Sequence, residues 1–227
     1  MTISPLLDFL LPRTCHVCGA LLNESEKYIC TPCLTGLPRT GYHRRPDNPM
    51  VQRFAGLFPF ERCTGHFFYT PNSELAAVIH DFKYRHFRNL GIFMGETIAN
   101  DLLMTGFLND MDAVIPIPMH FMKQARRGYN QTQQLARGIS KVTGIPVDLS
   151  LKAVKPHRTQ TSMTHAQRLA NAEGVFRLRH PELLAGKHIL LLDDVCTTGA
   201  TLTAAAHAIL DAQPSARISL LTLAVTF

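Results

Sequence analysis

The stretch from residue 189 to residue 202 constrains the fold more than any other part of the chain. It reads ILLLDDVCTTGATL, in which four aliphatic residues precede two aspartates and a turn of small residues. A continuous apolar run is typical of a central parallel strand that is covered on both faces. The Ala-rich segment 200–212 after the turn predicts a helix. The sequence therefore predicts a buried strand that delivers two carboxylates to a tight turn and a helix.

Strands and helices alternate along the chain after residue 71. Apolar residues at helical spacing predict helices over 75–82 and 92–103, with a break near Arg88. The other predicted elements are strands over 112–118, 188–192 and 218–225 and a helix over 132–142. This alternation favours right-handed βαβ connections, and so an α/β fold with a parallel sheet.

The two aspartates and the turn suit a sugar phosphate. Asp193 and Asp194 can accept hydrogen bonds from neighbouring ribose hydroxyls, and their charge would stabilise a cationic anomeric carbon. An anion is favoured at the turn, where backbone N–H groups and a helix N-terminus converge. The contacts predicted there are Val195, Thr197, Thr198, Gly199 and Thr201. The alternative, a surface strand end and a helix cap, explains less, because a cap needs one polar residue rather than two acids and three threonines.

The first cysteines form two CxxC pairs, Cys15 with Cys18 and Cys30 with Cys33, with eleven residues between the pairs. Four thiolates close a tetrahedron around Zn²⁺ and leave no position open for a substrate, so we expect a structural zinc site. The alternatives are two buried thiol pairs or a redox dithiol. We expect that His16, which lies inside the first pair, is not a ligand.

The composition bounds the partners and the compartment. Lys and Arg number 23 against 17 for Asp and Glu, so the formal charge of +6 favours an anionic partner, either a phosphate ester or a nucleic acid. No apolar run reaches the roughly 18 residues that cross a bilayer. Six cysteines without an export signal predict a cytoplasmic protein, because the reducing cytosol keeps thiols free.

Further motifs follow one another between the cysteine pairs and the end of the chain. They are FKY at 82–84, PIPMH at 116–120, RGYNQ at 127–131, Gln160-Thr161, Arg168, Asn171, Gly174 and Phe176. Together with the CxxC pairs and the Asp-Asp turn, they resemble the ComF family of type I phosphoribosyltransferase-like proteins. That family is linked in bacteria to competence and the use of external DNA.

The resemblance implies a type I phosphoribosyltransferase-like parallel sheet flanked by helices over residues 61–227. A small zinc-finger module and a linker would precede it over residues 1–60. The ligand implied is phosphoribosyl pyrophosphate with Mg²⁺. Asp193 and Asp194 would take its ribose hydroxyls, and residues 197–201 its 5′-phosphate.

The loop after Ile117 would hold the pyrophosphate with Mg²⁺. Basic side chains suit this group, because arginine can grip its oxygens in a fork. The candidate pyrophosphate contacts are Lys83, Lys123, Arg127 and Arg158. The segment 152–168 has little periodicity and is interpreted as a loop that can close over the substrate.

Two functions remain open from the sequence. The first is transfer of the phosphoribosyl group to an unidentified acceptor. The second is a non-catalytic DNA-processing adaptor that contacts single-stranded DNA or a competence helicase. The surface predicted for the adaptor interleaves aromatic and basic residues, namely Tyr42, Phe54, Phe58, Phe60, Arg39, Arg44, Arg45 and Arg53. The alternative for these aromatic residues is packing inside the fold.

Overall fold

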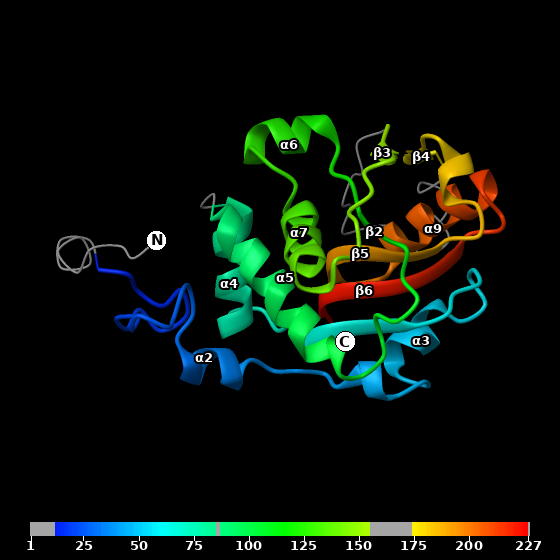
Figure 1. The fold of residues 1–227 in the computed structure, drawn as a ribbon. Helices are drawn as coiled ribbons and strands as arrows, with labels where there is room; N and C mark the ends of the chain where they lie inside the picture. The colour runs from blue at the N-terminus through cyan, green and yellow to red at the C-terminus, as the bar shows by residue number, and fades with distance from the viewer. Residues whose placement is uncertain (1–11, 85–86, 155–173, 227) are drawn as a thin grey trace.

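A four-stranded parallel sheet forms the centre of the molecule (Figure 1). The computed structural model of the chain describes residues 12–84, 87–154 and 174–226. The strands lie in the order β1-β6-β5-β2 and comprise β1 (Cys63–Phe68), β2 (Ala113–Pro116), β5 (His188–Cys196) and β6 (Arg217–Val225). The predicted α/β class is therefore confirmed, and three of the four strands lie where the sequence predicts them.

Helices cover both faces of this sheet (Figure 1). On one face lie α4 (Glu74–Tyr84), α5 (Arg88–Leu103) and α7 (Gln131–Thr143). On the other lie α9 (Ala200–Ala212) and the short α3 (Pro49–Phe54). The helices predicted from apolar spacing are confirmed. The result is a three-layer arrangement in which the carboxyl ends of all four strands share one edge.

The alternating side chains of β5 explain why there are two cores. Leu190 and Leu192 belong to the core under α4, α5 and α7, whereas Leu191 belongs to the core under α9. A strand that is covered on both faces must be apolar at every position, as the sequence is here. Glycine permits the close crossing of α5 and α7, since a Cβ atom on Gly95 or Gly138 would collide with the backbone of the other helix.

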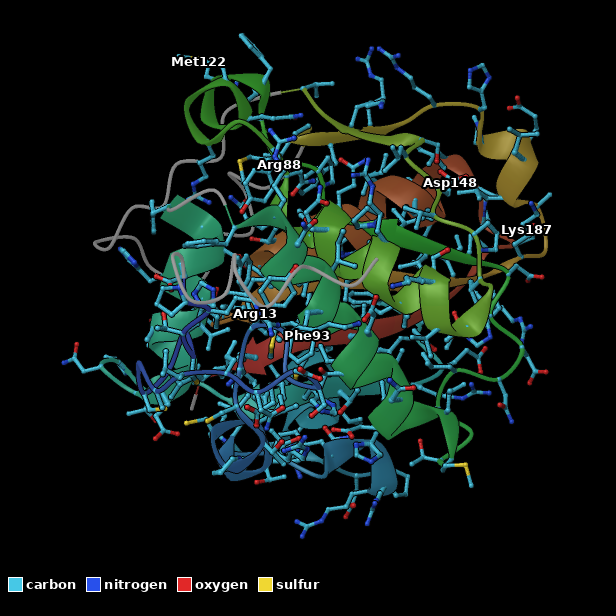
Figure 2. The ribbon with its side chains drawn as sticks, turned by 60° about the vertical axis from the view of Figure 1, so that its left-hand side comes forward. Arg13, Arg88, Phe93, Met122, Asp148 and Lys187 are labelled. Carbon is cyan, nitrogen blue, oxygen red and sulfur yellow. The ribbon has the colours of Figure 1, made fainter. Side chains whose placement is uncertain are left out.

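Two segments differ from their predicted form. The loop expected after Ile117 contains a helix, α6 (Phe121–Arg127), because the sequence of this helix holds good helix formers and neither glycine nor proline. Figure 2 shows Met122 pointing outward from α6, where it is 62% exposed. The predicted loop 152–168 begins inside β3 (Leu151–Ala153), which pairs antiparallel with β4 (Phe176–Leu178). Its remainder from residue 155 lies outside the described residues.

The N-terminal part of the chain packs against the same two cores. It contains α2 (Thr31–Gly36) and the 3₁₀ turn η1 (Tyr42–Arg44), and a second 3₁₀ turn, η2 (Pro181–Leu184), precedes β5. Tyr42, Phe54 and Phe58 are buried beneath α9 and β1. These three rings therefore pack inside the fold and do not form the single-strand surface that the adaptor hypothesis predicts. Among the described residues, no helix is both long and apolar enough to cross a bilayer.

Candidate functional site

A cavity of about 950 Å³ opens at the carboxyl ends of β2 and β5. It is lined by α4, the loop after β2, the start of α7 and the start of β4, together with the turn after β5. The predicted site residues that line it are Lys83, Arg127, Asp193, Asp194, Val195, Thr197 and Thr201. Thr198 and Gly199 belong to the turn without lining the cavity. The side chain of Lys123 and all of Arg158 lie outside the part of the chain that the structure describes.

The acid pair lies within β5, at the sixth and seventh of its nine residues, and not beyond its end. Alternation along the strand turns Asp194 toward α4, where its Oδ2 atom lies 2.5 Å from Nζ of Lys83. Each of these two side chains is 18% exposed. The Asp194 N–H donates to Oδ1 of Asp193 at 2.8 Å, and the Val195 N–H donates to Oδ1 of Asp194 at 2.7 Å. Both carboxylates are therefore fixed by the local backbone and one is paired with a cation.

Asp193 has a strongly perturbed proton affinity. Burial, followed by the negative charge of neighbouring Asp194, raises the pKa of Asp193 to about 8. The Asp194 N–H and the Lys83 charge oppose this rise without cancelling it. A raised pKa favours the protonated form of Asp193, which can donate a hydrogen bond as well as accept one. Perturbed acids in a cavity are typical of functional sites.

The turn between β5 and α9 requires a glycine, and a side chain of α3 supports it through hydrogen bonds. Gly199 has φ +83°, and a Cβ atom there would lie 2.7 Å from the ring of Phe54. Arg53 on α3 donates from Nη1 to the Thr197 carbonyl at 2.5 Å and from Nη2 to the Thr226 carbonyl at 2.8 Å. Arg53 is therefore a supporting residue of the turn. Sequence reasoning assigned it to a DNA surface, because no pattern links residues so far apart in the chain.

The FKY and RGYNQ motifs contact one another at the rim of the cavity. The buried Tyr129 hydroxyl donates to the Phe82 carbonyl. Gln131 Nε2 donates to the Lys83 carbonyl at 3.5 Å. These contacts hold the C-terminal end of α4 against the start of α7, and so they hold Lys83 beside β5.

Arg127 joins the same two motifs through its guanidinium group. Its Nη2 atom donates to the Tyr84 hydroxyl at 3.2 Å, and Cζ lies 4.9 Å from the centre of the Tyr84 ring. Nη1 donates to Gln131 Oε1 at 3.4 Å. The Nε atom is buried without a hydrogen-bond partner among the described residues. One donor of a cavity-lining arginine is thus unpaired.

The end of β2 is held by the polar start of α7. Asn130 Nδ2 donates to the Ile117 carbonyl at 3.0 Å, and the Thr132 hydroxyl donates to the same oxygen at 2.7 Å. Asn130 Oδ1 also accepts from the Thr132 N–H at 3.2 Å and so caps the helix. These residues fix the point at which the cavity-lining loop of Pro118, Met119 and His120 begins. Sequence reasoning noted Asn130 in a motif but assigned it no such role.

The four predicted cysteine ligands come together beside α4. Their sulfur atoms all lie within 4.8 Å of one another, and Cys18 Sγ lies 3.7 Å from Cys30 Sγ. Four sulfurs about 2.3 Å from a tetrahedral zinc ion would be about 3.8 Å apart. Cys15 Sγ accepts N–H groups from Val17 at 3.4 Å and Cys30 at 3.3 Å. The four cysteines are therefore positioned to bind a metal, and the donor set fits zinc.

Backbone donors also favour the thiolate form that a metal needs. Burial alone would raise the pKa of Cys15, but N–H groups of Cys18, Cys30 and Val17 outweigh burial and lower the pKa to about 6. His16 does not belong to the group of potential ligands and instead places Nδ1 2.7 Å from Asp81 Oδ2 on α4. The cysteine cluster is thereby joined to the helix that carries Lys83.

Comparison with known proteins relates the sheet domain to a known family. The phosphoribosyl transferase domain family matches residues 96–225. Competence protein F of Haemophilus influenzae is 30% identical over 215 residues, which cover 87% of this chain and 90% of that protein. Competence protein ComFC of Bacillus subtilis is 32% identical over 222 residues, which cover 93% and 83%.

A third relative has a related name. DNA utilization protein YhgH of Escherichia coli K12 is 26% identical over 200 residues, which cover 86% of this chain and 83% of that protein. The similarity to these proteins extends over most of the chain. The phosphoribosyl transferase match and the competence relatives together show that this chain belongs to the ComF family of phosphoribosyltransferase-like proteins.

Proposed function

We propose that the chain binds phosphoribosyl pyrophosphate with Mg²⁺ in the cavity and transfers its phosphoribosyl group to an acceptor. The observation that carries this proposal is the joint placement of Asp193, Asp194 and the turn at Thr197–Thr201 on one cavity wall. Facing them on the same cavity are the cations Lys83 and Arg127. A sugar with an anion at each end matches an acid pair that lies between two anion-favouring regions.

The turn after β5 takes the 5′-phosphate in this proposal. Backbone N–H groups point out of the first turn of α9, and the helix dipole favours negative charge there. Thr197 and Thr201 line the cavity and add hydroxyl donors. Gly199 lets the backbone approach closely, and Arg53 supports the Thr197 carbonyl from behind. Asp193 and Asp194 then meet the ribose hydroxyls next to the phosphate.

The cations lie where the leaving group would be. Lys83 and Arg127 would contact the pyrophosphate, as would Lys123 and Arg158. Mg²⁺ is bound mainly by substrate phosphates and waters, with few protein ligands, and would supply charge neutralisation on the leaving pyrophosphate. Because Lys83 already pairs with Asp194, an arriving pyrophosphate would compete for its ammonium group and free the carboxylate for the sugar.

The transfer itself breaks the bond between the anomeric carbon and the pyrophosphate oxygen. The electron pair of that bond leaves with pyrophosphate, and an acceptor lone pair forms the new bond while the acceptor gives up a proton. Positive charge develops on the sugar in between, and the Asp193–Asp194 pair stabilises it electrostatically. Release of pyrophosphate from phosphoribosyl pyrophosphate and Mg²⁺, assayed across a panel of acceptors, tests this step. Equal release by an Asp193→Asn/Asp194→Asn variant would contradict the assignment.

The cysteine cluster has a structural role in this proposal. Four thiolates would hold one Zn²⁺ and leave no open position, so the ion would support the fold and not the chemistry. We propose a zinc-binding module and linker over residues 1–60, ahead of the phosphoribosyltransferase-like domain over residues 61–227. Reduced thiols are needed, which favours the cytoplasm. The competence names of the relatives support a role in the handling of external DNA.

A DNA-processing adaptor is the second candidate function, favoured by the name of the relative DNA utilization protein YhgH. Three of the four aromatic residues of its predicted surface, Tyr42, Phe54 and Phe58, are buried in the core instead. Salt-dependent binding of single-stranded DNA that survives Asp193→Asn/Asp194→Asn would support the adaptor. No binding at low ionic strength by zinc-loaded protein would remove direct DNA contact from the proposal.

A further inference from the structure

His120 is a buried polar side chain on the wall of the cavity. It follows β2, precedes the first residue of α6, lines the cavity and is 8% exposed. Its Nδ1 atom is buried and has no hydrogen-bond partner among the described residues. Most buried polar atoms in native proteins are paired, so each exception needs a reason. A ligand in the cavity would supply the missing partner.

The ring of His120 is held in place independently of that nitrogen. The His120 carbonyl accepts the Gln124 N–H at 3.0 Å, which anchors the backbone in the first turn of α6. The imidazole packs against the Phe121 ring with the ring centres 4.5 Å apart. Because Asn130 also fixes the preceding Ile117 carbonyl, the loop between them has little freedom to turn Nδ1 toward a protein acceptor.

A second unpaired nitrogen on the same cavity indicates the chemistry of the ligand. Arg127, the last residue of α6, lines the cavity with a buried Nε that has no partner among the described residues. Arginine only donates hydrogen bonds, so its partner must be an acceptor. His120 Nδ1 donates in one neutral tautomer and in the protonated ring. An anion with acceptor oxygens is thus the kind of partner that suits both nitrogens.

A metal ion does not account for His120. Among the described residues, the only group of three or more potential ligand atoms within 4.8 Å of one another is that of the four cysteines. His120 is therefore not arranged with Asp193 and Asp194 as a metal site. The neighbouring cations Lys83 and Arg127 favour an anion in this part of the cavity.

We propose that His120 donates a hydrogen bond from Nδ1 to the pyrophosphate of the bound substrate, beside Arg127. The inference rests on the proposed function and adds a ligand-contacting residue to it. In this proposal His120 makes a charge-assisted hydrogen bond to the pyrophosphate. It makes none to the 5′-phosphate, which is bound at the turn after β5. His120 therefore contributes to the preference for a sugar with a second anion over one without it.

Separate probes for the two anions test the proposal on the full, zinc-loaded chain. Calorimetry would measure inorganic pyrophosphate with Mg²⁺, and ribose 5-phosphate, against wild type, His120→Leu and His120→Asn. Asparagine can keep an N–H near the position of Nδ1, whereas leucine keeps volume alone. His80→Leu is the matched control, because His80 lines the same cavity but its side chain is 58% exposed.

The expected pattern separates the contact from general damage. His120→Leu should lower pyrophosphate affinity about tenfold or more, the loss expected for one hydrogen bond to a charged group. Ribose 5-phosphate affinity should stay within about twofold, as should pyrophosphate affinity in His80→Leu. His120→Asn should recover most of the loss.

Each other outcome overturns a defined claim. Unchanged pyrophosphate affinity in His120→Leu, an equal loss for both ligands, or an equal loss in His80→Leu would overturn the role of His120. Wild type that binds ribose 5-phosphate but not pyrophosphate would overturn it as well and leave the sugar-phosphate site intact. Wild type that binds neither ligand would overturn the proposed function itself.

Discussion

The ammonium group of Lys83 lies 2.5 Å from a carboxylate oxygen of Asp194, and this pair joins the end of α4 to the central strand β5. Both side chains are mostly buried, so solvent screens the pair less than a surface ion pair. The contact places a cation beside the acid pair before any ligand arrives. It also makes the position of α4 a determinant of the site.

Loss of the Lys83 charge should therefore destabilise the fold. Lys83→Met leaves Asp194 beside Asp193 without its cation, and we expect a loss of about 1–2 kcal/mol in the free energy of unfolding, between the values for exposed and buried pairs. Urea denaturation at pH 7 measures it. Lys141→Met is the control, because Lys141 makes an ion pair of the same length with Glu96 but is 66% exposed, and it should cost less than about 1 kcal/mol. Equal losses in the two variants would refute the special role of Lys83.

Gly199 should not tolerate a side chain. Gly199→Ala forces alanine to φ +83° and against the Phe54 ring, so we expect a loss of at least about 1–2 kcal/mol in unfolding free energy, and weaker ribose 5-phosphate binding. Gly186→Ala is the control, since it has a similar φ of +67° and no atom within 4 Å. The difference between the two variants reports the contact with Phe54. Ribose 5-phosphate affinity that survives Gly199→Ala would argue against the turn as its site.

The cysteine cluster should hold one zinc ion per chain. Cys30→Ser removes a thiolate, so metal analysis of the purified variant should find the zinc lost, and residues 12–37 should become sensitive to protease. Cys63→Ala, which alters a buried cysteine outside the cluster, should keep the metal. A Cys30→Ser protein with full zinc content and unchanged protection would contradict the four-thiolate site.

Acid should also weaken the contact between Asp101 and His66, a residue of the edge strand β1. The hydrogen bond with His66, and then the charge of Arg39, lower the pKa of Asp101 to about 2. A carboxyl whose pKa is lowered in the folded state stabilises the fold above its unfolded pKa of about 4, and that contribution is lost as the pH falls toward 2. Unfolding free energies measured from pH 5 to pH 2 should therefore fall more steeply in wild type than in Asp101→Asn. Asp211→Asn, at an exposed position, should follow wild type, and parallel curves for wild type and Asp101→Asn would count against the contact.

Strong local patterns made most of the fold predictable. The continuous apolar run at 189–192 identified β5, apolar spacing identified α4 and α5, and the Ala-rich segment after the turn identified α9. The edge strand β1 was not predicted, because CTGHFF shows no regular alternation and is stabilised by its pairing with β6. The three-residue strands β3 and β4 are too short to leave a periodic signal.

The site was predictable where one segment carries the chemistry. The Asp-Asp turn and the CxxC pairs each carry their candidate residues within a short segment, and the structure brings each group together. Arg53 and Asn130 act through contacts with distant carbonyls, so only the folded chain shows what they do. His120 belongs to the PIPMH motif, but only the folded chain shows that one of its nitrogen atoms is buried without a partner among the described residues.

Calorimetric titration with phosphoribosyl pyrophosphate and Mg²⁺ tests the central claim most directly. Asp193→Asn/Asp194→Asn keeps side-chain size but removes the charged acceptors, so affinity should fall by about 1.5–3 kcal/mol for each lost charged hydrogen bond, with non-additivity between neighbours. Wild type should bind, and the double variant should bind far more weakly while still folded by circular dichroism. Equal affinity in the two proteins, or no binding by zinc-loaded wild type, would contradict the assignment of this cavity to a phosphoribosyl ligand.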